Sequence, residues 1–168
     1  SCGSSITEAA QLIYEDAGLL NIAYGATAES LTQHGHRYFF RTSFRDDRQG
    51  DFFAELVTAH LNLQRIAIVH DNSTFARGLA EAARRSLAGK SGVEVVFYDA
   101  ITAGERDFTS TISRMRTTNP EVVYFTAYYP EAGLFLRQMR DAGVDALFIG
   151  GNAAINDEFI EIAGLSVA

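Results

Sequence analysis

The chain of 168 residues has the composition of a folded globular protein, with 47% apolar and 21% charged residues. Its 14 Lys and Arg against 21 Asp and Glu give a net charge of −7. The basic residues form no cluster that could follow a phosphate backbone, which argues against nucleic acid and against an acidic membrane surface as partners.

The start of the chain carries the only cysteine, Cys2, so no disulfide can form within the chain. We interpret Cys2 as a half-cystine whose partner lies elsewhere. No initiator Met, signal peptide or polar leader precedes the first predicted helix. We therefore expect a fragment or a processed piece, in which the lack of a targeting segment says nothing about location.

The first 42 residues predict one helix and two short strands. Ser5 and Glu8 have the spacing of a capping box, and apolar residues then recur at helical intervals until Gly18. Residues 19–23 predict a short buried strand, and residues 38–44 predict another because they are rich in aromatic and β-branched side chains. These elements alone do not close a sheet, so residues 1–42 are interpreted as the end of an α/β lobe, with the second strand crossing to the next lobe.

The rest of the chain, residues 43–168, predicts a second α/β lobe. Apolar segments alternate with segments whose apolar residues recur at helical intervals. Strands that are apolar throughout and separated by amphipathic helices indicate an open, doubly wound parallel sheet covered on both faces. The predicted strands are 65–70, 93–98, 122–126 and 146–149, and the predicted helices are 74–87, 107–117 and 130–142.

Ligands of such sheets bind at the carboxyl ends of the strands. Tyr128 and Tyr129 stand there, just before Pro130, which suits the first position of a helix. At least one of the two rings is expected to face the crevice above the sheet. The alternative is that both rings only cover the edge of the sheet.

A second candidate site is the start of the first helix. Amides at a helix N-terminus can hold a carboxylate without a cationic side chain, and Ser4 and Ser5 lie there. Gly25 and Thr27 follow the next strand and could offer a carbonyl and a hydroxyl to the same crevice. A helix cap and an ordinary turn would explain these residues equally well.

Enzyme signatures are absent from the sequence. It contains no dinucleotide-binding glycine pattern, no phosphate loop and no nucleophile elbow. His34 and His36 lack an acidic or thiol partner at ligand spacing and are interpreted as a solvated loop. We expect neither an enzyme nor a bound cofactor or metal.

Several segments together resemble the periplasmic branched-chain amino-acid binding proteins, the type I solute-binding components of ABC importers. The similarity runs across nearly the whole chain in the order of the family. It is carried by residues 13–18, 25–27, 41–42, 65–71, 101–108 and 128–133. The resemblance implies two α/β lobes, joined by crossover strands, that clamp a ligand between them.

The resemblance also assigns roles to particular residues. Ser4 matches the serine that binds the ligand carboxylate, with Ser5 beside it, and Gly25 and Thr27 match positions that contact the polar end of the ligand. Tyr128 resembles a tyrosine that engages the ammonium side, whereas Tyr129 is expected to pack. The complete set of expected ligand-binding residues is Ser4, Ser5, Gly25, Thr27, Phe75, Tyr128 and Asn152.

Two of these residues depart from the family pattern. Phe75 stands where relatives often carry Tyr, so stacking is kept without the hydroxyl. Asn152 stands where relatives that bind amino acids usually place an acidic residue opposite the ligand ammonium. Another carboxylate, such as Asp71, Glu131 or Asp157, is a candidate to replace it.

We therefore expect a solute-binding protein of an ABC importer, exported to the periplasm and partnered by a membrane permease. Its expected ligand is a small carboxylate, with a branched-chain or small apolar amino acid first. The alternative is a sensing domain of a receptor or regulator with the same fold, of the amide or aromatic-acid type. With the first lobe incomplete, we also expect residues 1–42 either to be poorly ordered or to pack against another chain, which would give a dimer.

Overall fold

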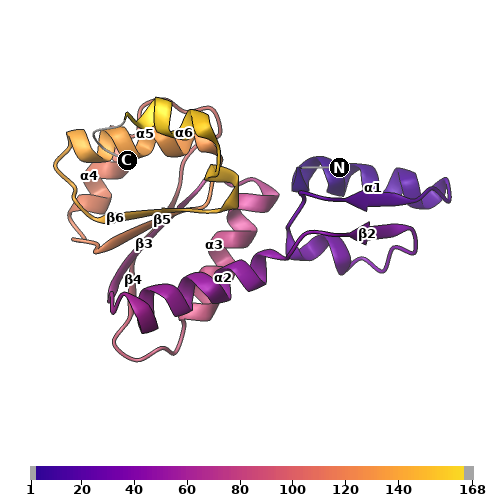
Figure 1. Cartoon of the computed structure of the whole chain (residues 1–168), viewed down its shortest axis with the longest axis horizontal. Helices are drawn as coiled ribbons and strands as arrows, with labels where there is room; N and C mark the ends of the chain where they lie inside the picture. The colour runs from indigo at the N-terminus through magenta and orange to yellow at the C-terminus, as the bar shows by residue number, and fades with distance from the viewer. Residues whose placement is uncertain (1–2, 165–168) are drawn as a thin grey trace.

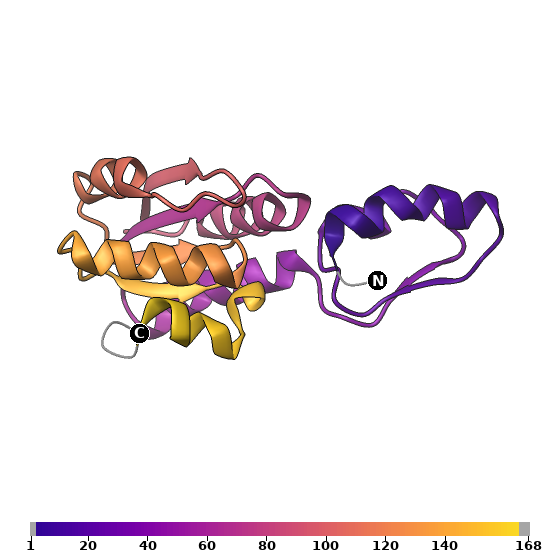
Figure 2. The same ribbon diagram turned by 90° about the horizontal axis from the view of Figure 1, so that it is seen from above.

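The computed structural model describes residues 3–164 of the chain, so Cys2 and its predicted disulfide lie outside the described residues. The described part contains two parallel sheets in two bodies joined by residues 42–45 (Figure 1; Figure 2). One body is a small unit built on α1 (Ser4–Asp16), and the other is a larger unit built around a four-stranded sheet. None of the described helices is long and apolar enough to cross a lipid bilayer.

The larger sheet confirms the predicted doubly wound architecture. All of its neighbouring strands are parallel, in the order β4-β3-β5-β6. β3 and β5 lie in the middle and are buried almost throughout, which explains why their sequences are continuously apolar. The strands are β3 (Arg65–His70), β4 (Glu94–Ala100), β5 (Val122–Phe125) and β6 (Leu147–Gly150).

Helices cover both faces of this sheet (Figure 1). α2 (Asp46–Glu55), which continues as the π-helical segment η2 (Leu56–His60), packs with α3 (Thr74–Leu87) on one face. The other face carries α4 (Thr109–Arg116), α5 (Tyr129–Asp141) and α6 (Asp157–Ala163), and the short helix η3 (Asn152–Ala154) follows β6. Rings on β5 pack against rings of both helical layers: Tyr124 stacks on Phe53 of α2, and Phe125 contacts Phe135 of α5.

The smaller body consists of α1 (Ser4–Asp16), β1 (Asn21–Ala23), η1 (Glu29–Thr32) and β2 (Phe39–Arg41). Its only apolar cluster among the described residues contains Ala23, Ala26, Ala28, Leu31 and Phe39. This cluster is separate from the core of the larger sheet. A boundary between residues 42 and 43 remains a prediction, and the two separate apolar clusters are compatible with it.

The burial pattern of α1 is the reverse of an ordinary surface helix. The buried side chains, Ser4, Thr7 and Gln11, are polar, and Gln11 donates a hydrogen bond to the Leu31 carbonyl (2.7 Å). By contrast, Ile6 and Ile13 are 72% and 70% exposed. The apolar side of this helix therefore lacks a covering layer among the described residues.

The predicted capping box is wrong. α1 begins at Ser4 with Gly3 as its N-cap, and no side chain caps its first turn. Ser5 lies inside that turn and is exposed, while the carboxylate of Glu8 accepts a hydrogen bond from the Thr74 hydroxyl in the other body (3.0 Å). A tertiary contact has taken the side chain that the local pattern assigned to capping.

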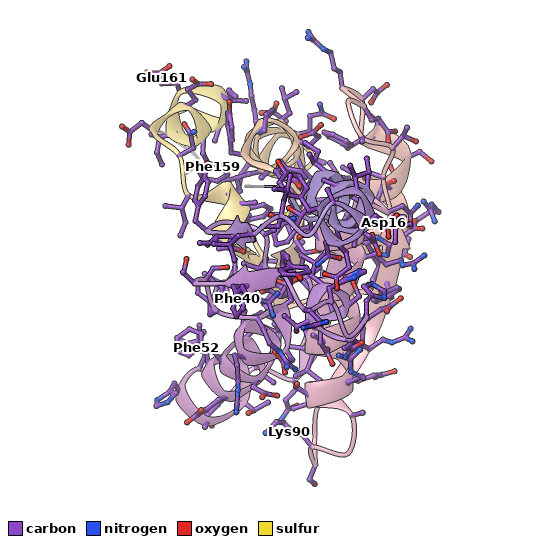
Figure 3. The ribbon with its side chains drawn as sticks, turned by 90° about the vertical axis from the view of Figure 1, so that its right-hand side faces the viewer. Asp16, Phe40, Phe52, Lys90, Phe159 and Glu161 are labelled. Atoms are coloured by element: carbon purple, nitrogen blue, oxygen red, sulfur yellow. The ribbon has the colours of Figure 1, made fainter. Side chains whose placement is uncertain are left out.

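Large aromatic side chains are exposed on both bodies. Phe40 on β2 is 54% exposed, and Phe52 is 65% exposed and stands out from its helix (Figure 3). Such exposure of large apolar side chains on several elements marks surfaces that a partner layer would cover.

A substitution at Gly50 tests how closely α2 and α3 pack. A Cβ at this position would lie 2.7 Å from the backbone of Ala82 and Ala83. We expect Gly50→Ala to lower the free energy of unfolding by about 1–3 kcal/mol, measured by urea denaturation, because the helices must move apart. Gly78→Ala is the matched control, since its Cβ would meet only the Asp46 carboxylate at 3.8 Å. Equal stability of the two variants would contradict this close packing.

Because the apolar face of α1 is exposed, we expect the chain to self-associate through the smaller body. Sedimentation velocity over a concentration series should show dimer formation, and Ile13→Asp should shift the chain towards the monomer because it places a charge on the apolar face. Ile155→Asp is the control, because Ile155 is 85% exposed on the other body. A monomer at every concentration, or equal effects of the two substitutions, would contradict the prediction.

Candidate functional site

The candidate site lies where the direction of the sheet changes, between β3 and β5. From β3 the chain moves to β4 on one side and then crosses to β5 and β6 on the other. Such a switch point opens a crevice at the carboxyl ends of the strands. A cavity of about 500 Å³, called the cleft below, lies there between the start of α1 and these strand ends. Its walls include Gly3, Ser5 and Ile6 on one side and Asp71, Tyr128 and Glu131 on the other.

The wall formed by α1 is the open N-terminus of a helix. Its first turn contains no acidic residue and no side-chain cap. Because the first amides of a helix have no partner within it, and the helix dipole is positive at this end, the wall attracts an anion. The Ser4 hydroxyl lies just behind, 2% exposed, and accepts a hydrogen bond from the Ala28 amide at 3.2 Å. Its own hydrogen remains available for a further bond.

The opposite wall is aromatic. Tyr128 is the N-cap of α5 and is 37% exposed, while Phe75 is buried behind it. The two ring centroids are 5.5 Å apart and the planes are tilted by 52°, an arrangement typical of stable aromatic pairs. Tyr129 also lines the cleft, and the hydrogen bond between its hydroxyl and the Glu158 carboxylate raises the pKa of Tyr129.

Thr27 and Gly25 lie on the turn that follows β1. Thr27 is 1% exposed, and its carbonyl accepts a hydrogen bond from the Asp46 amide at 3.0 Å. This bond joins the smaller body to the start of α2. The Thr27 hydroxyl has no partner at normal hydrogen-bond geometry among the described residues. Gly25 is half-buried at the start of the same turn.

Asp46 is a buried acid at the junction of the two bodies. Its side chain is fully buried, and neither carboxylate oxygen has a partner at normal hydrogen-bond geometry among the described residues. Burial raises the pKa of Asp46 to about 6, although the nearby Thr27 hydroxyl and the Arg41 guanidinium act to lower it. The carboxylates of Asp47 and Glu29 act in the same direction as burial.

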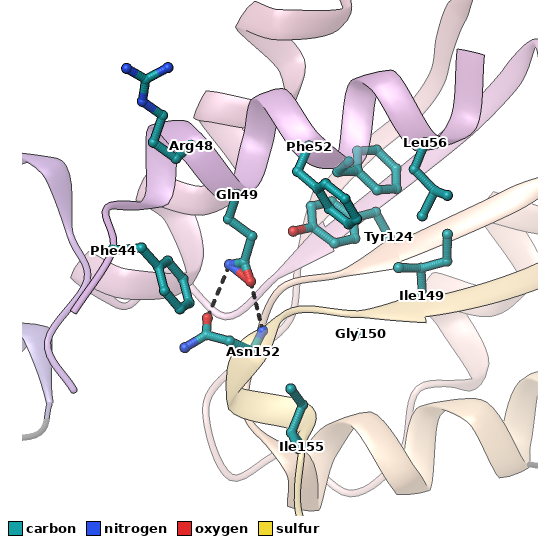
Figure 4. A pocket seen from close by; sticks show the side chains of 11 residues that line it. Phe44, Arg48, Gln49, Phe52, Leu56, Tyr124, Ile149, Gly150, Asn152 and Ile155 are labelled. Atoms are coloured by element: carbon teal, nitrogen blue, oxygen red, sulfur yellow. Dashed lines mark hydrogen bonds between the residues drawn. The ribbon is translucent and has the colours of Figure 1, made fainter. Parts of the chain in front are cut away.

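Asn152 lies outside the cleft, at the start of η3. Its side-chain oxygen accepts a hydrogen bond from Gln49 Nε2, and its amide donates one to Gln49 Oε1, both at 3.0 Å (Figure 4). The residue lines a second cavity of about 390 Å³, called the side cavity, whose walls include Phe44, Phe52 and Tyr124. Gln49 was not among the predicted site residues, because the sequence pattern did not predict the helix α2 that carries it.

The structure therefore groups the seven expected ligand-binding residues into three sets. Ser5 and Tyr128 face each other across the cleft, with Ser4 and Phe75 buried behind them. Thr27 and Gly25 lie at the junction near Asp46, and Asn152 lies in the side cavity. The ligand-binding role of each remains a prediction.

Among the candidates to replace an acid at position 152, Asp71 and Glu131 line the cleft, and Asp157 is not among its lining residues. Their places could be inferred only in part, because Asp71 follows a predicted strand and Glu131 begins a predicted helix. Among the described residues, no cluster of three or more His, Cys, Asp or Glu has the geometry to hold a metal ion.

Comparison with known sequences gives a consistent set of relatives. The sequence pattern of a family described as periplasmic binding protein matches residues 1–166. The chain is 43% identical over 163 residues to the Leu/Ile/Val/Thr-binding protein of Salmonella typhimurium, and 42% identical over 163 residues to the Leu/Ile/Val-binding protein of Escherichia coli K12. Each match covers 97% of this chain but 44% of the relative, so the chain spans less than half the length of these proteins.

Solved structures show the same relation. The chain superposes on the branched-chain amino acid transporter substrate binding protein LivJ of Streptococcus pneumoniae, solved in complex with isoleucine, with a TM-score of 0.84 and 31% identity. It superposes on the leucine binding protein LivK of Thermotoga maritima with a TM-score of 0.90 and 26% identity. These matches cover 94% and 98% of this chain, and 44% and 46% of the solved chains.

The buried acid at the junction predicts a pH dependence of stability. Because the folded pKa of Asp46 lies above the usual value of 3.8, the folded state binds the proton more tightly, so stability falls as the pH rises from about 4 to about 6. The penalty is then fully present above pH 6. Asp46→Asn should remove it, so the variant should gain more stability over the unmodified protein at pH 7 than at pH 5, by about 1 kcal/mol. Urea denaturation at the two pH values measures this difference, and an equal gain at both would contradict it.

Proposed function

This chain belongs to the periplasmic binding protein family, and we propose that it acts in the solute-binding component of an ABC importer. The proposed ligand is a small carboxylate held between two lobes, and a branched-chain or small apolar amino acid is the first candidate. The names of the relatives that are more than 40% identical support this choice. The proposed role is binding and delivery without a catalytic step.

The observation that carries the proposal is the pairing of unlike walls across the cleft. The open N-terminus of α1 faces the carboxyl ends of β3 and β5, with Ser5 on one wall and Tyr128 on the other. The helix terminus suits the carboxylate of a ligand, and the aromatic wall suits its apolar part. In this arrangement Ser4 and Ser5 serve the carboxylate, and Phe75 holds the Tyr128 ring in place.

Residues 1–42 are proposed to form the C-terminal part of a first lobe, and residues 43–168 the second. Three observations support this division. The smaller body has its own small apolar cluster, the apolar side of α1 is exposed, and the relatives are more than twice as long as this chain. The proposed dimer would cover the same exposed side in the isolated chain.

Closure of the lobes is proposed to signal that the ligand is bound. Exposed side-chain contacts also join the bodies: Thr74 donates to the Glu8 carboxylate, and Arg85 pairs with the Glu29 carboxylate at 2.9 Å. Such exposed pairs contribute little energy each and can form or break as the lobes move. The permease of the importer would recognise the closed form, and the proposed location is the periplasm.

Calorimetric titration of the complete protein with leucine, with valine and with carboxylates that lack an amino group tests the proposal. We expect saturable binding of at least one branched-chain amino acid. The isolated 168-residue chain should bind it weakly or not at all, because part of the clamp is missing. Failure of the complete protein to bind any small carboxylate would contradict the proposed function.

The helix terminus can be tested separately with Ser5→Asp. An acidic residue in the first turn stabilises a helix, so the fold should be kept or strengthened by about 0.3–1 kcal/mol. The same charge repels a ligand carboxylate in the cleft, and leucine affinity should fall at least about tenfold.

Ser110→Asp is the matched control for this substitution. Ser110 is the second residue of α4, is exposed, and is not among the residues that line the cleft. Calorimetry should show unchanged leucine affinity for this variant. Unchanged affinity in Ser5→Asp as well would show that the α1 terminus does not hold the carboxylate.

A further inference from the structure

The charges that line the cleft are of one sign. Asp71 and Glu131 are acidic, and the described lining residues include no Lys, Arg or His. The α1 wall therefore carries an open helix terminus without an acidic residue, while the opposite wall, where α5 also begins, carries the carboxylates of Asp71 and Glu131. A ligand with a carboxylate at one end and a positive group at the other fits this distribution of charge.

Asn152 is not suited to meet that positive group. The backbone amide of Asn152 can only donate, so the Gln49 atom that it contacts must be the oxygen, Oε1. Gln49 Nε2 then has to donate to Asn152 Oδ1, which occupies one of the two lone pairs of that oxygen. The NH₂ group of the side chain, a donor, points away from Gln49 (Figure 4). Asn152 offers an ammonium group only a neutral oxygen that already accepts one hydrogen bond, and such a bond is weaker than one to a carboxylate.

Asp71 has the properties that Asn152 lacks. It is 6% exposed and lines the cleft at the end of β3, on the wall that also carries Tyr128. Its Oδ1 accepts a hydrogen bond from the Ser73 amide at 2.9 Å, which fixes the carboxylate and leaves the second oxygen without a hydrogen bond to any described residue. A carboxylate with little access to water attracts a cation more strongly than an exposed one.

Glu131 is the weaker candidate on the same wall. Its Oε1 accepts a hydrogen bond from the Gly104 amide at 2.9 Å, and its side chain is more exposed than that of Asp71.

We propose that Asp71 is the charged partner of the ligand ammonium group and the residue that makes the cleft selective for amino acids. This inference rests on the proposed function, because it takes the ligand to be a small carboxylate bound at the α1 terminus. The ligand then lies with its carboxylate at Ser5 and its ammonium group at Asp71. Residue 152 has no part in recognising the charge.

The test compares two ligands that differ at one group. Leucine and 4-methyl-2-oxopentanoate share a carbon skeleton and a carboxylate, but only leucine has an ammonium group. Asp71→Asn keeps an oxygen that can accept from the Ser73 amide and removes only the charge. In calorimetric titrations of the complete protein, this variant should lose roughly 10- to 100-fold in leucine affinity. Its affinity for the oxo acid should change by less than about threefold, because no charge pair is lost.

Asp107→Asn is the matched control, because Asp107 Oδ1 also accepts from the amide two residues later, that of Thr109, and Asp107 is not among the residues that line the cleft. It should leave the affinity for both ligands unchanged. The double variant Asp71→Asn with Asn152→Asp should stay as weak towards leucine as Asp71→Asn alone.

Three results would overturn the inference. Unchanged leucine affinity in Asp71→Asn would show that Asp71 does not contact the ammonium group, and an equal loss for both ligands would show a structural role. Restored leucine affinity in the double variant would assign the ammonium group to residue 152. If the unmodified protein binds neither compound, the proposed function itself fails, and this outcome is distinct from the other three.

Discussion

The site depends on one constraint, the position of the α1 N-terminus against the carboxyl edge of the four-stranded sheet. Parallel strands bring the ends of β3 and β5 to the same edge, and the change of direction between them opens the cleft there. α1 belongs to the other body, and it meets this edge because the Thr27 carbonyl binds the first amide of α2 and Glu8 binds Thr74. The candidate site is therefore a product of how the two bodies meet, and neither body contains it alone.

The junction that sets this position contains a buried acid whose charged form is disfavoured. Asp46 places a fully buried carboxylate at the start of α2, beside a threonine whose hydroxyl is also unpartnered among the described residues. Burial disfavours the charged form of the carboxyl group and outweighs the opposing effects of Thr27 and Arg41, which is why the pKa of Asp46 rises to about 6.

Much of the larger body could be predicted from the sequence, because its signals are local. The strand Arg65–His70 and the helix Thr74–Leu87 have the bounds that were predicted from the spacing of apolar residues and from the residues that flank them. α2 could not be predicted so easily, since its buried face is made of Asp46, Gly50, Phe53 and Ala54, which do not form an apolar stripe. The capping box failed for a related reason, because a tertiary contact took the side chain of Glu8. In the candidate site, Tyr128 could be predicted because it follows a predicted strand. The hydrogen bond between Gln49 and Asn152 could not be predicted, because the two residues are 103 positions apart in the sequence.

A crystal structure of the complete protein with leucine tests the central claim most directly, by locating the ligand carboxylate. The account predicts ligand density in the cleft, with the carboxylate against the amides of the first turn of α1 and the apolar chain beside Tyr128. Ligand density confined to the side cavity near Asn152 would contradict it, as would a closed protein in which α1 and Tyr128 face different sides.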